Sequence, residues 1–450
     1  MSSLKQVFSL PVASIILART IYAVNWFNIS SIFYLILDDF RQDVSMLGLV
    51  TSGFLIGIGL FQIPAGILSA KYDAKFMIFF GTMLLSISSL LSGLSSELYQ
   101  MVILRFLVGV GMAFFFGPSV ILISKYLGKG SSGLGVGILN SAHSLGGIIG
   151  IFGWIIIAEA LGWRTSLVIS GTLGILSGLF LLYALQIKYY DRTSNLSSHS
   201  FKEKVFIFFR FFNLNRENRD QKAKFTINFD DLKSIMLNKH MIYVGLSLLG
   251  FQIAWNLVST FIILFLKVEL DIASSIAGLI GGSTMIVNVI FAPFIGRIYD
   301  KLTRKNNFNN DILLLLICGI VISANIICLS LLNIYLLIPS ILIIGIFISG
   351  GFVIPYALAR RIALEKLGLP KYEILAVSFV NGLSLLGAFW VPFVFSIVVK
   401  SFGYSLAWLF GGTLRPTARA RRRVRRREYS ERAIRPRLLQ PTWSSDVELP

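Results

Sequence analysis

Long apolar runs dominate the chain and alternate with short polar segments. Eleven of these runs are long enough for a helix to cross a bilayer, which takes about 20 apolar residues. They lie at about residues 11–37, 46–70, 76–94, 99–122, 133–161, 165–187, 241–266, 274–296, 312–332, 335–359 and 374–399. Because a lipid-exposed backbone must satisfy its own hydrogen bonds, the runs predict membrane-spanning helices. The sequence lacks the short alternating segments that are typical of barrel strands.

A twelfth apolar run begins at Gly403 and stops at Leu414, at about half the length of a span. The segment 415–450 that follows is rich in Arg, and no Lys occurs after Lys400. We interpret this change of composition as a frameshift or a fusion. The alternative is a genuine basic tail that begins within the membrane. On either interpretation, the sequence predicts a twelfth helix truncated at about Leu414.

The composition excludes most classes of soluble protein. Hydrophobic residues make up 55% of the chain, charged residues 14%, and the mean hydropathy is +0.76. A soluble domain has about a quarter charged residues. The net charge of +19 does not indicate nucleic-acid binding, because the bases lie mostly between the apolar runs. With a cytoplasmic N-terminus, 24 of these bases face the cytoplasm and four face outward, which predicts a multi-pass plasma-membrane protein in that orientation.

An internal repeat relates the two halves of the chain. One shift of the chain against itself superimposes Trp26 on Trp255 and Pro64 on Pro293, and a slightly longer shift superimposes Asn140 on Asn381 and Gly146 on Gly387. Such a parallel repeat brings two helical bundles together around a central path. We therefore predict an all-α integral membrane protein of two pseudo-symmetric six-helix bundles. The predicted parts are an N-terminal bundle (1–187), a basic cytoplasmic linker (188–240), a C-terminal bundle (241–414) and the Arg-rich tail (415–450).

Four sequence features carry a resemblance to a known family. They are GILSAKYDAK (66–75), its repeat GRIYDKLTRK (296–305), LRFLVGVGMA (104–113) and, as a looser match, the Gly-rich run GILNSAHSLGGIIG (137–150). With them, residues 5–414 resemble the transporters of the major facilitator superfamily. The matching positions are Gly66, Lys71, Asp73 and Lys75 in the first loop motif, Gly296, Asp300, Lys301 and Arg304 in the second, and Arg105, Gly109 and Gly111 in the membrane motif.

One departure from the family pattern affects the expected gating. The family's acidic residue falls on Ala70 in the first loop motif, whereas the second motif keeps it as Asp300. The resemblance implies that this loop pairs charges between the bundles and holds the outward-facing state. We therefore expect that lock to rest on the second motif here.

Polar side chains inside the spans are the candidates for substrate binding, because their burial in a membrane is costly and often functional. The resemblance and the repeat place such a site near the midplane, between the bundles. The candidates are Arg19, Asn25, Trp26, Asn28, Asn140, His143, Gln252, Trp255, Asn256 and Asn381.

Each candidate has a functional and a structural interpretation. Arg19 suits a carboxylate or phosphate through its planar guanidinium, or it snorkels or pairs within the bundle. Arg105 supports structure or takes part in coupling. The amides bind substrate or link helices, and His143 titrates during transport or simply packs. No carboxylate occupies the middle of a span in the sequence, which argues against a standard carboxylate proton relay.

These features predict a secondary transporter that moves a small polar or anionic metabolite across the cytoplasmic membrane by alternating access. The expected partners are this substrate, a coupling proton or other ion, and the lipid bilayer, with no nucleic acid. We expect a monomer without metal or cofactor, and no enzyme, because the sequence offers no nucleophile paired with a base and no metal cluster. The alternatives are an efflux carrier for hydrophobic compounds and a truncated membrane protein that does not transport.

Overall fold

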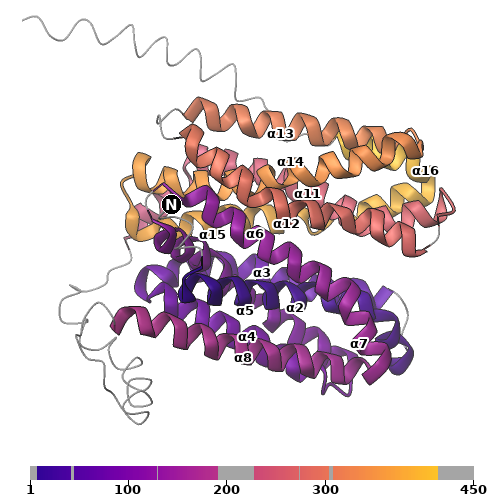
Figure 1. Cartoon of the computed structure of the whole chain (residues 1–450), viewed down its shortest axis with the longest axis horizontal. Coiled ribbons are helices and arrows are strands. Elements are labelled where there is room, and N and C mark those ends of the chain that lie inside the picture. Colours follow the sequence, from indigo (N-terminus) through magenta and orange to yellow (C-terminus); the bar gives the residue numbers. More distant parts are fainter. Residues whose placement is uncertain are drawn as a thin grey trace, which may run out of the picture.

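The computed structural model describes residues 8–41, 45–128, 130–190, 228–272, 274–303 and 308–413. These parts are helical, and no strand occurs among them. Ten of the described helices are long and apolar enough to cross a membrane. The helices run roughly parallel to one axis of the molecule, with residues 10–190 gathered on one side and residues 239–413 on the other (Figure 1). This arrangement confirms the predicted membrane protein of two helical bundles.

The first bundle holds six spans. Its elements are α2 (Leu10–Phe40), α3 (Ser45–Lys71), α4 (Ala74–Ser92), α5 (Leu98–Leu127), α6 (Ser132–Ile148) with the π-helical turn η1 (Ile149–Gly153) and α7 (Trp154–Leu161), and α8 (Trp163–Tyr190). The fifth span is α6, η1 and α7 together. Asp73 caps α4 by accepting a hydrogen bond from the Lys75 backbone N–H at 2.8 Å. The last helix passes the predicted bundle boundary at residue 187.

The second bundle follows the same order. Its elements are α11 (Lys239–Val268), α12 (Ser274–Thr303), α13 (Phe308–Leu329), α14 (Ile334–Arg361) with the turns η2 (Ile362–Lys366) and η3 (Pro370–Tyr372), α15 (Glu373–Ala388) and α16 (Val391–Thr413). We call the end of the molecule where α8 ends and α11 begins the linker end. Just before α11, the short helix α10 (Phe229–Met236) buries Leu232 and Ile235 in the larger hydrophobic core.

The eleventh predicted run does not form one continuous helix. Its first part, α15, ends at Ala388, and α16 begins at Val391 after a turn. Pro392 lacks the backbone N–H that would bond to Ala388, so it suits the start of a new helix. In the first bundle, the alignment that pairs Asn140 with Asn381 places the π-helical turn η1 at the same point. The fifth helix of each bundle is therefore irregular at this depth.

The start of the twelfth helix confirms the repeat at the level of the backbone. A kink at Gly403 divides α16, with φ of 78°. The repeat-related Gly162, which precedes α8, has φ of 84°. Both lie in the left-handed region that only glycine adopts cheaply. After the kink, Trp408 packs on Phe265 with ring centroids 5.6 Å apart. The truncation predicted at Leu414 and the tail 415–450 lie outside the described residues.

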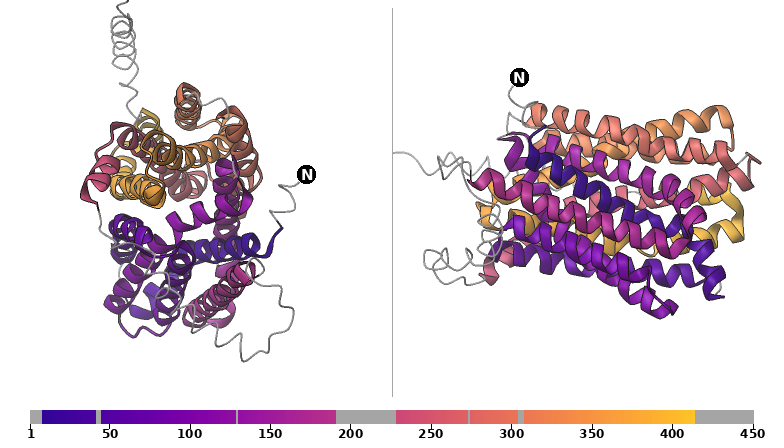
Figure 2. Two further views of the ribbon diagram at one scale, coloured as in Figure 1. Left: turned by 90° about the vertical axis from the view of Figure 1, so that its left-hand side faces the viewer. Right: turned by 60° about the horizontal axis from the view of Figure 1, so that its bottom comes forward.

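The bundles meet along two seams, α6 against α12 and α3 against α15 (Figure 2). In the first seam, Gly133 approaches Gly296 so closely that a Cβ on either glycine would strike the other's backbone. In the second, a Cβ on Gly66 would come within 2.9 Å of the Leu375 Cα atom. Glycine at these positions therefore permits close contact between the bundles, and a cavity remains between the two seams.

Candidate functional site

The cavity between the bundles contains most of the predicted site residues. It holds about 60 Å³, and one water-sized group needs about 10–15 Å³. Seven of the ten candidates line it, namely Arg19, Trp26, Asn140, His143, Gln252, Trp255 and Asn381. Its walls also include Tyr22, Phe116, Asn288, Phe352 and Tyr356, which the sequence analysis did not select. Whether these residues bind a substrate stays a prediction.

Arg19 brings a formal charge into the cavity. Its side chain is 5% exposed, and the guanidinium carbon lies 4.2 Å from the centre of the Tyr22 ring and 4.9 Å from that of Phe116. Among the described residues, its Nε and Nη1 atoms have no hydrogen-bond partner. Arg remains protonated in proteins. The site therefore presents a buried cation with unused donors, held between two aromatic faces.

The described residues that line the cavity include no Asp or Glu. An Arg buried in this way normally requires an anionic partner or several carbonyl groups. The two orphaned donors of Arg19 instead face a space lined by amides, hydroxyls and aromatic rings. This arrangement fits a ligand that supplies the negative charge itself.

Tyr356 links the walls of the cavity near Arg19. Its hydroxyl donates to Asn381 Oδ1 at 2.6 Å, and its ring lies edge-on to Phe116 with centroids 4.8 Å apart. Phe116 lies on α5 and Phe352 on α14, the fourth helices of the two bundles, so each bundle places a phenyl ring on the cavity wall. Nothing distinguishes these rings in the sequence from the apolar residues that surround them.

Unpartnered amides complete the polar lining. Asn140 Nδ2 and Asn288 Oδ1 are buried, and neither has a partner among the described residues. Gln252 donates to Asn256 Oδ1 at a long 3.5 Å, and Asn256 itself lies outside the lining. Asn140 therefore offers a free amide donor, and Asn288 a free amide acceptor, in addition to Arg19.

His143 lies in an aromatic box. Its ring meets Trp26 edge-on at 5.6 Å and lies 6.0 Å from Tyr22 and 5.6 Å from Phe27 between ring centroids. Its Nδ1 atom has no partner among the described residues. The surroundings fit a packing role, whereas the residue itself lines the cavity. The titration of His143 during transport stays a prediction.

Asn25 and Asn28 lie away from the cavity and bind Arg105. The Arg105 guanidinium donates through Nη1 to the Asn25 backbone carbonyl at 2.9 Å and through Nη2 to Asn28 Oδ1 at 3.2 Å. Asn28 Nδ2 in turn donates to Ser170 Oγ at 3.1 Å. This network ties α2 to α5 and α8 within the first bundle. It favours the structural interpretation of Arg105 and of both amides.

The two glycines of the membrane motif serve helix packing. Gly109 in α5 touches the backbone of α3 at Phe54, and Gly111 touches α4, where a Cβ would come within 2.5 Å of the Leu85 nitrogen. A side chain at either position would separate α5 from its neighbours. The motif thus combines close packing with the buried network around Arg105.

The second loop motif joins the bundles at the linker end. Asp300 of α12 accepts hydrogen bonds from the backbone N–H groups of Gly133 at 2.7 Å and Leu134 at 2.8 Å. Its carboxylate thus caps the start of α6, where free N–H groups favour a negative charge. Lys301 is exposed, and the predicted Arg304 lies outside the described residues.

The first loop motif has Ala70 at the position of this carboxylate. The Lys71 ammonium lies 5.4 Å from the centre of the Tyr72 ring. Asp73 caps α4 by accepting a hydrogen bond from the Lys75 backbone N–H. Gly66 provides the close packing against α15 described above. These contacts involve no charge pair between the bundles.

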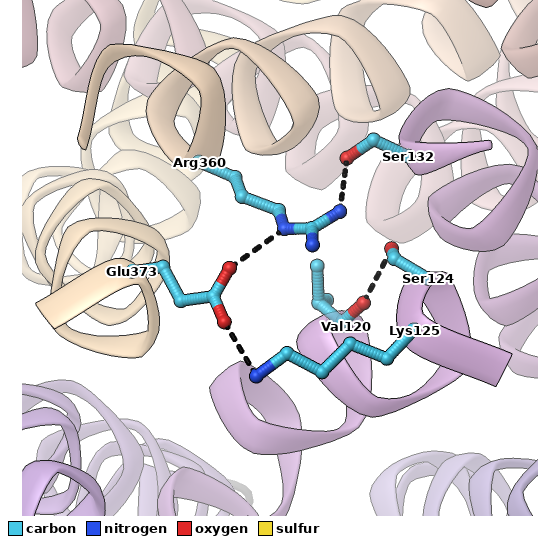
Figure 3. A network of polar contacts seen from close by, with 6 residues as sticks. All are labelled: Val120, Ser124, Lys125, Ser132, Arg360 and Glu373. Carbon is cyan, nitrogen blue, oxygen red and sulfur yellow. Dashed lines mark hydrogen bonds and ion pairs between the residues drawn. The ribbon is translucent and has the colours of Figure 1, made fainter. Parts of the chain in front are cut away.

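Glu373 instead provides a buried carboxylate at this seam. It lies in the first turn of α15 and pairs with Lys125 of α5 at 2.7 Å and with Arg360 of α14 at 3.0 Å (Figure 3). Arg360 also donates to Ser132 Oγ at 3.3 Å. This network crosses between the bundles twice. The sequence analysis missed it, although an acid at the start of an apolar run was a signal.

A protein-family model matches most of the chain. The model described as Major Facilitator Superfamily matches residues 15–368. Among solved structures, the proton:xylose symporter XylE superimposes with a TM-score of 0.67 at 16% identity, over 91% of this chain and 94% of that one. At this identity the likeness concerns the fold alone, and it agrees with the two-bundle arrangement.

Three curated relatives share parts of the sequence. An uncharacterized MFS-type transporter of Methanocaldococcus jannaschii is 28% identical over 57% of this chain and 60% of its own length. A probable sulfoacetate transporter of Cupriavidus necator is 29% identical over 36% of this chain and 37% of its own. A hexuronate transporter of Bacillus subtilis is 30% identical over 31% and 33%. The matched parts thus cover less than two thirds of each relative's own length.

Proposed function

The chain belongs to the Major Facilitator Superfamily, and from this premise we propose that it is a secondary transporter of small organic anions. It would move its substrate across the cytoplasmic membrane by alternating access, with Arg19 as the anion-binding residue. The single observation that carries this proposal is the buried guanidinium of Arg19 in a central cavity, with two unpartnered donors and no Asp or Glu in the described lining. The fold supports the coarser statement that the protein is a membrane transporter and not an enzyme.

The chemistry of the cavity supports an organic anion. A guanidinium binds carboxylate, sulfonate or phosphate oxygens through two parallel hydrogen bonds, and such charge-assisted bonds are stronger than neutral ones. The rings of Trp26, Trp255 and Phe352 provide apolar walls for the carbon skeleton. Two relatives are named for sulfoacetate and for hexuronate, both of which carry such an acidic group.

The contacts at the linker end support alternating access. The Asp300 cap on α6 and the network around Glu373 hold the two bundles together on this side of the cavity. With the orientation predicted from the bases, this side is cytoplasmic. Breaking these contacts opens the cavity inward, while the buried network around Arg105 keeps the first bundle rigid during the motion.

Uptake into proteoliposomes tests the proposal. The probes are labelled glucuronate and sulfoacetate, with glucose as the neutral control for glucuronate because the two differ at one carboxylate. We expect anion uptake without glucose uptake. Arg19→Gln should weaken apparent anion affinity at least a hundredfold, which corresponds to about 2.8 kcal/mol.

A second arginine provides the matched control. Arg164 pairs with Asp39 at 3.0 Å and is half-exposed, away from the cavity. We expect Arg164→Gln to keep normal anion affinity. Export of hydrophobic compounds that persists in Arg19→Gln would instead support the efflux alternative, and anion uptake that is insensitive to Arg19→Gln would contradict the proposed role of this residue.

A further inference from the structure

We propose that the transporter is an obligatory anion exchanger, which switches between its inward-facing and outward-facing states only while an anion is bound beside Arg19. The entry of one anion would then require the exit of another. The inference rests on the proposed function of the same cavity, and it adds the mode of coupling. It follows from the charges inside and around the cavity.

The empty cavity carries an uncompensated positive charge. Among its lining residues in the described ranges, Arg19 is the one Lys, Arg, Asp or Glu. Tyr22 and Phe116 offer their ring faces to the guanidinium, which offsets part of the lost hydration. They supply no acceptor for the Nε and Nη1 donors, which remain without a partner among the described residues.

Reorientation is the step that this charge opposes. While the cavity is open to water, solvent hydrates the guanidinium. When both ends close during alternating access, the charge loses that hydration inside a membrane protein, which is costly without a counter-ion. A bound carboxylate or sulfonate neutralises the charge and fills the two free donors. The loaded form therefore crosses the occluded state more readily than the empty form.

The acids nearest the seams already have partners. Asp300 accepts from the backbone of Gly133 and Leu134, and Glu373 is paired with Lys125 and Arg360. Both lie at the linker end and outside the cavity lining. Neither carboxylate is thus available to neutralise Arg19 when the carrier is empty.

A proton cannot replace the anion in this role. His143 is the titratable imidazole on the cavity wall. Its ring lies beside the Tyr22 ring, and the Arg19 guanidinium lies over that same Tyr22 ring. Protonation of this histidine adds a second positive charge, which makes the empty occluded state less stable still. A carrier that returned empty after releasing a proton would need a carboxylate, and the described part of the lining has none.

Exchange is measured with the purified full chain in proteoliposomes. Labelled sulfoacetate or glucuronate is added outside vesicles that contain either the same unlabelled anion or sucrose. We expect entry to be at least tenfold faster with internal anion, equivalent to about 1.4 kcal/mol. Because equal charges move in both directions, a potassium diffusion potential should leave the exchange rate unchanged.

The outcomes separate this inference from the proposed function. Equal entry into both kinds of vesicle would overturn the exchange mechanism and leave the anion transporter standing. An inward proton gradient that drives entry into sucrose vesicles as fast as exchange would overturn it in favour of proton symport. A failure to transport either anion under any loading would contradict the proposed function and, with it, the exchange mechanism.

A carboxylate introduced beside Arg19 tests whether the charge of this residue restrains the empty carrier. The Phe116 ring lies 4.9 Å from the Arg19 guanidinium, so Phe116→Glu places a carboxylate beside it. Leu134 is buried where α6 meets α12, so a cysteine there reacts with an alkylating reagent only when the linker end opens. The rate of alkylation of Leu134→Cys therefore reports this opening, in a protein whose Cys318 and Cys328 have been replaced. In the otherwise unchanged protein we expect sulfoacetate to accelerate alkylation at least fivefold.

Phe116→Glu should show the accelerated rate without any anion. The matched control is Phe114→Glu, which introduces the same carboxylate on α5 next to Phe80 of α4 and outside the cavity lining. There we expect alkylation to remain slow until sulfoacetate is added. Alkylation that is equally fast in all three proteins without anion would show that the charge of Arg19 does not restrain the empty carrier.

Discussion

The two seams between the bundles both place a carboxylate at the first turn of a helix, but they obtain it in different ways. At the start of α6 the acid is Asp300, which reaches across from α12 in the other bundle. At the start of α15 it is Glu373, which belongs to that helix itself. The free N–H groups of a helix start favour a negative charge in both places. What recurs is therefore the charge at the helix start, whichever bundle supplies it.

The difference matters for how tightly each seam closes. Asp300 bonds directly to the backbone of the other bundle through two buried, charge-assisted hydrogen bonds, each worth about 1.5–3 kcal/mol. Glu373 reaches the first bundle through Lys125, whose side chain is 61% exposed. Such a half-solvated pair contributes less than about 1 kcal/mol. We therefore expect the α6–α12 seam to dominate the closed state at the linker end.

The largest expected effect comes from breaking the stronger seam with Asp300→Asn. The amide keeps one acceptor but turns its NH₂ group toward a backbone N–H, so the closed state should lose about 3 kcal/mol. Alkylation of Leu134→Cys should then become fast without substrate. The exposed Lys301, replaced by Gln, provides the control from the same motif. An unchanged alkylation rate in Asp300→Asn would contradict the ranking of the seams.

A smaller effect is expected from Glu373→Gln. It removes the charge that holds Lys125 and Arg360, and it leaves the half-buried Arg360 without its acid. Because both bases keep some contact with solvent, we expect a loss of about 1–2 kcal/mol in thermal stability and a moderate rise in linker-end alkylation. A loss larger than that of Asp300→Asn would reverse the comparison.

The interchangeability of the two arrangements is testable at residue 70. Alignment of the two loop motifs places Ala70 on Asp300. Asp300 caps the start of α6, so the repeat predicts that an acid at residue 70 caps the start of α15. We therefore expect Ala70→Asp to restore about 1 kcal/mol in the Glu373→Gln background. In the unchanged protein that position already has the acid of Glu373, so we expect no gain there. Thermal unfolding of the four proteins in one detergent checks both expectations.

The smallest effect should be that of Lys125→Gln. Its side chain is 61% exposed, so we expect a loss below about 0.5 kcal/mol that disappears in high salt. Unfolding curves at low and high ionic strength measure it. A salt-independent loss above about 1 kcal/mol would show that this pair is a main link between the bundles.

Hydropathy and the repeat predicted the architecture because both depend on where the backbone forms helices and where it bends, and not on the direction of individual side chains. Apolar length located the spans, and the repeat anticipated the equivalence of Gly162 and Gly403. The break between α15 and α16 was missed because a run of apolar residues hides a turn. Only Pro392 in that run signalled the end of a helix.

The site was predictable only in part because polarity does not define which way a helix residue faces. Arg19, Tyr22 and Trp26 follow the spacing of one helical face and line the cavity together. Asn25 and Asn28 are equally polar, but their positions on α2 turn both side chains toward Ser170 of α8. Applying the helical period to α2 from Arg19 onward would have separated the two groups. Even so, Phe116 and Tyr356 carry no sequence signal, because an aromatic residue in a span is ordinary core.

The paired glycines at 162 and 403 also bear on how the two halves have diverged. The two halves differ at many equivalent positions. Ala70 stands where the second half has Asp300, and His143 stands where it has Ser384. Neither glycine tolerates a replacement without strain, since each has a positive φ. In a duplicated gene, ancestry is thus recorded durably at the points where the chain must bend.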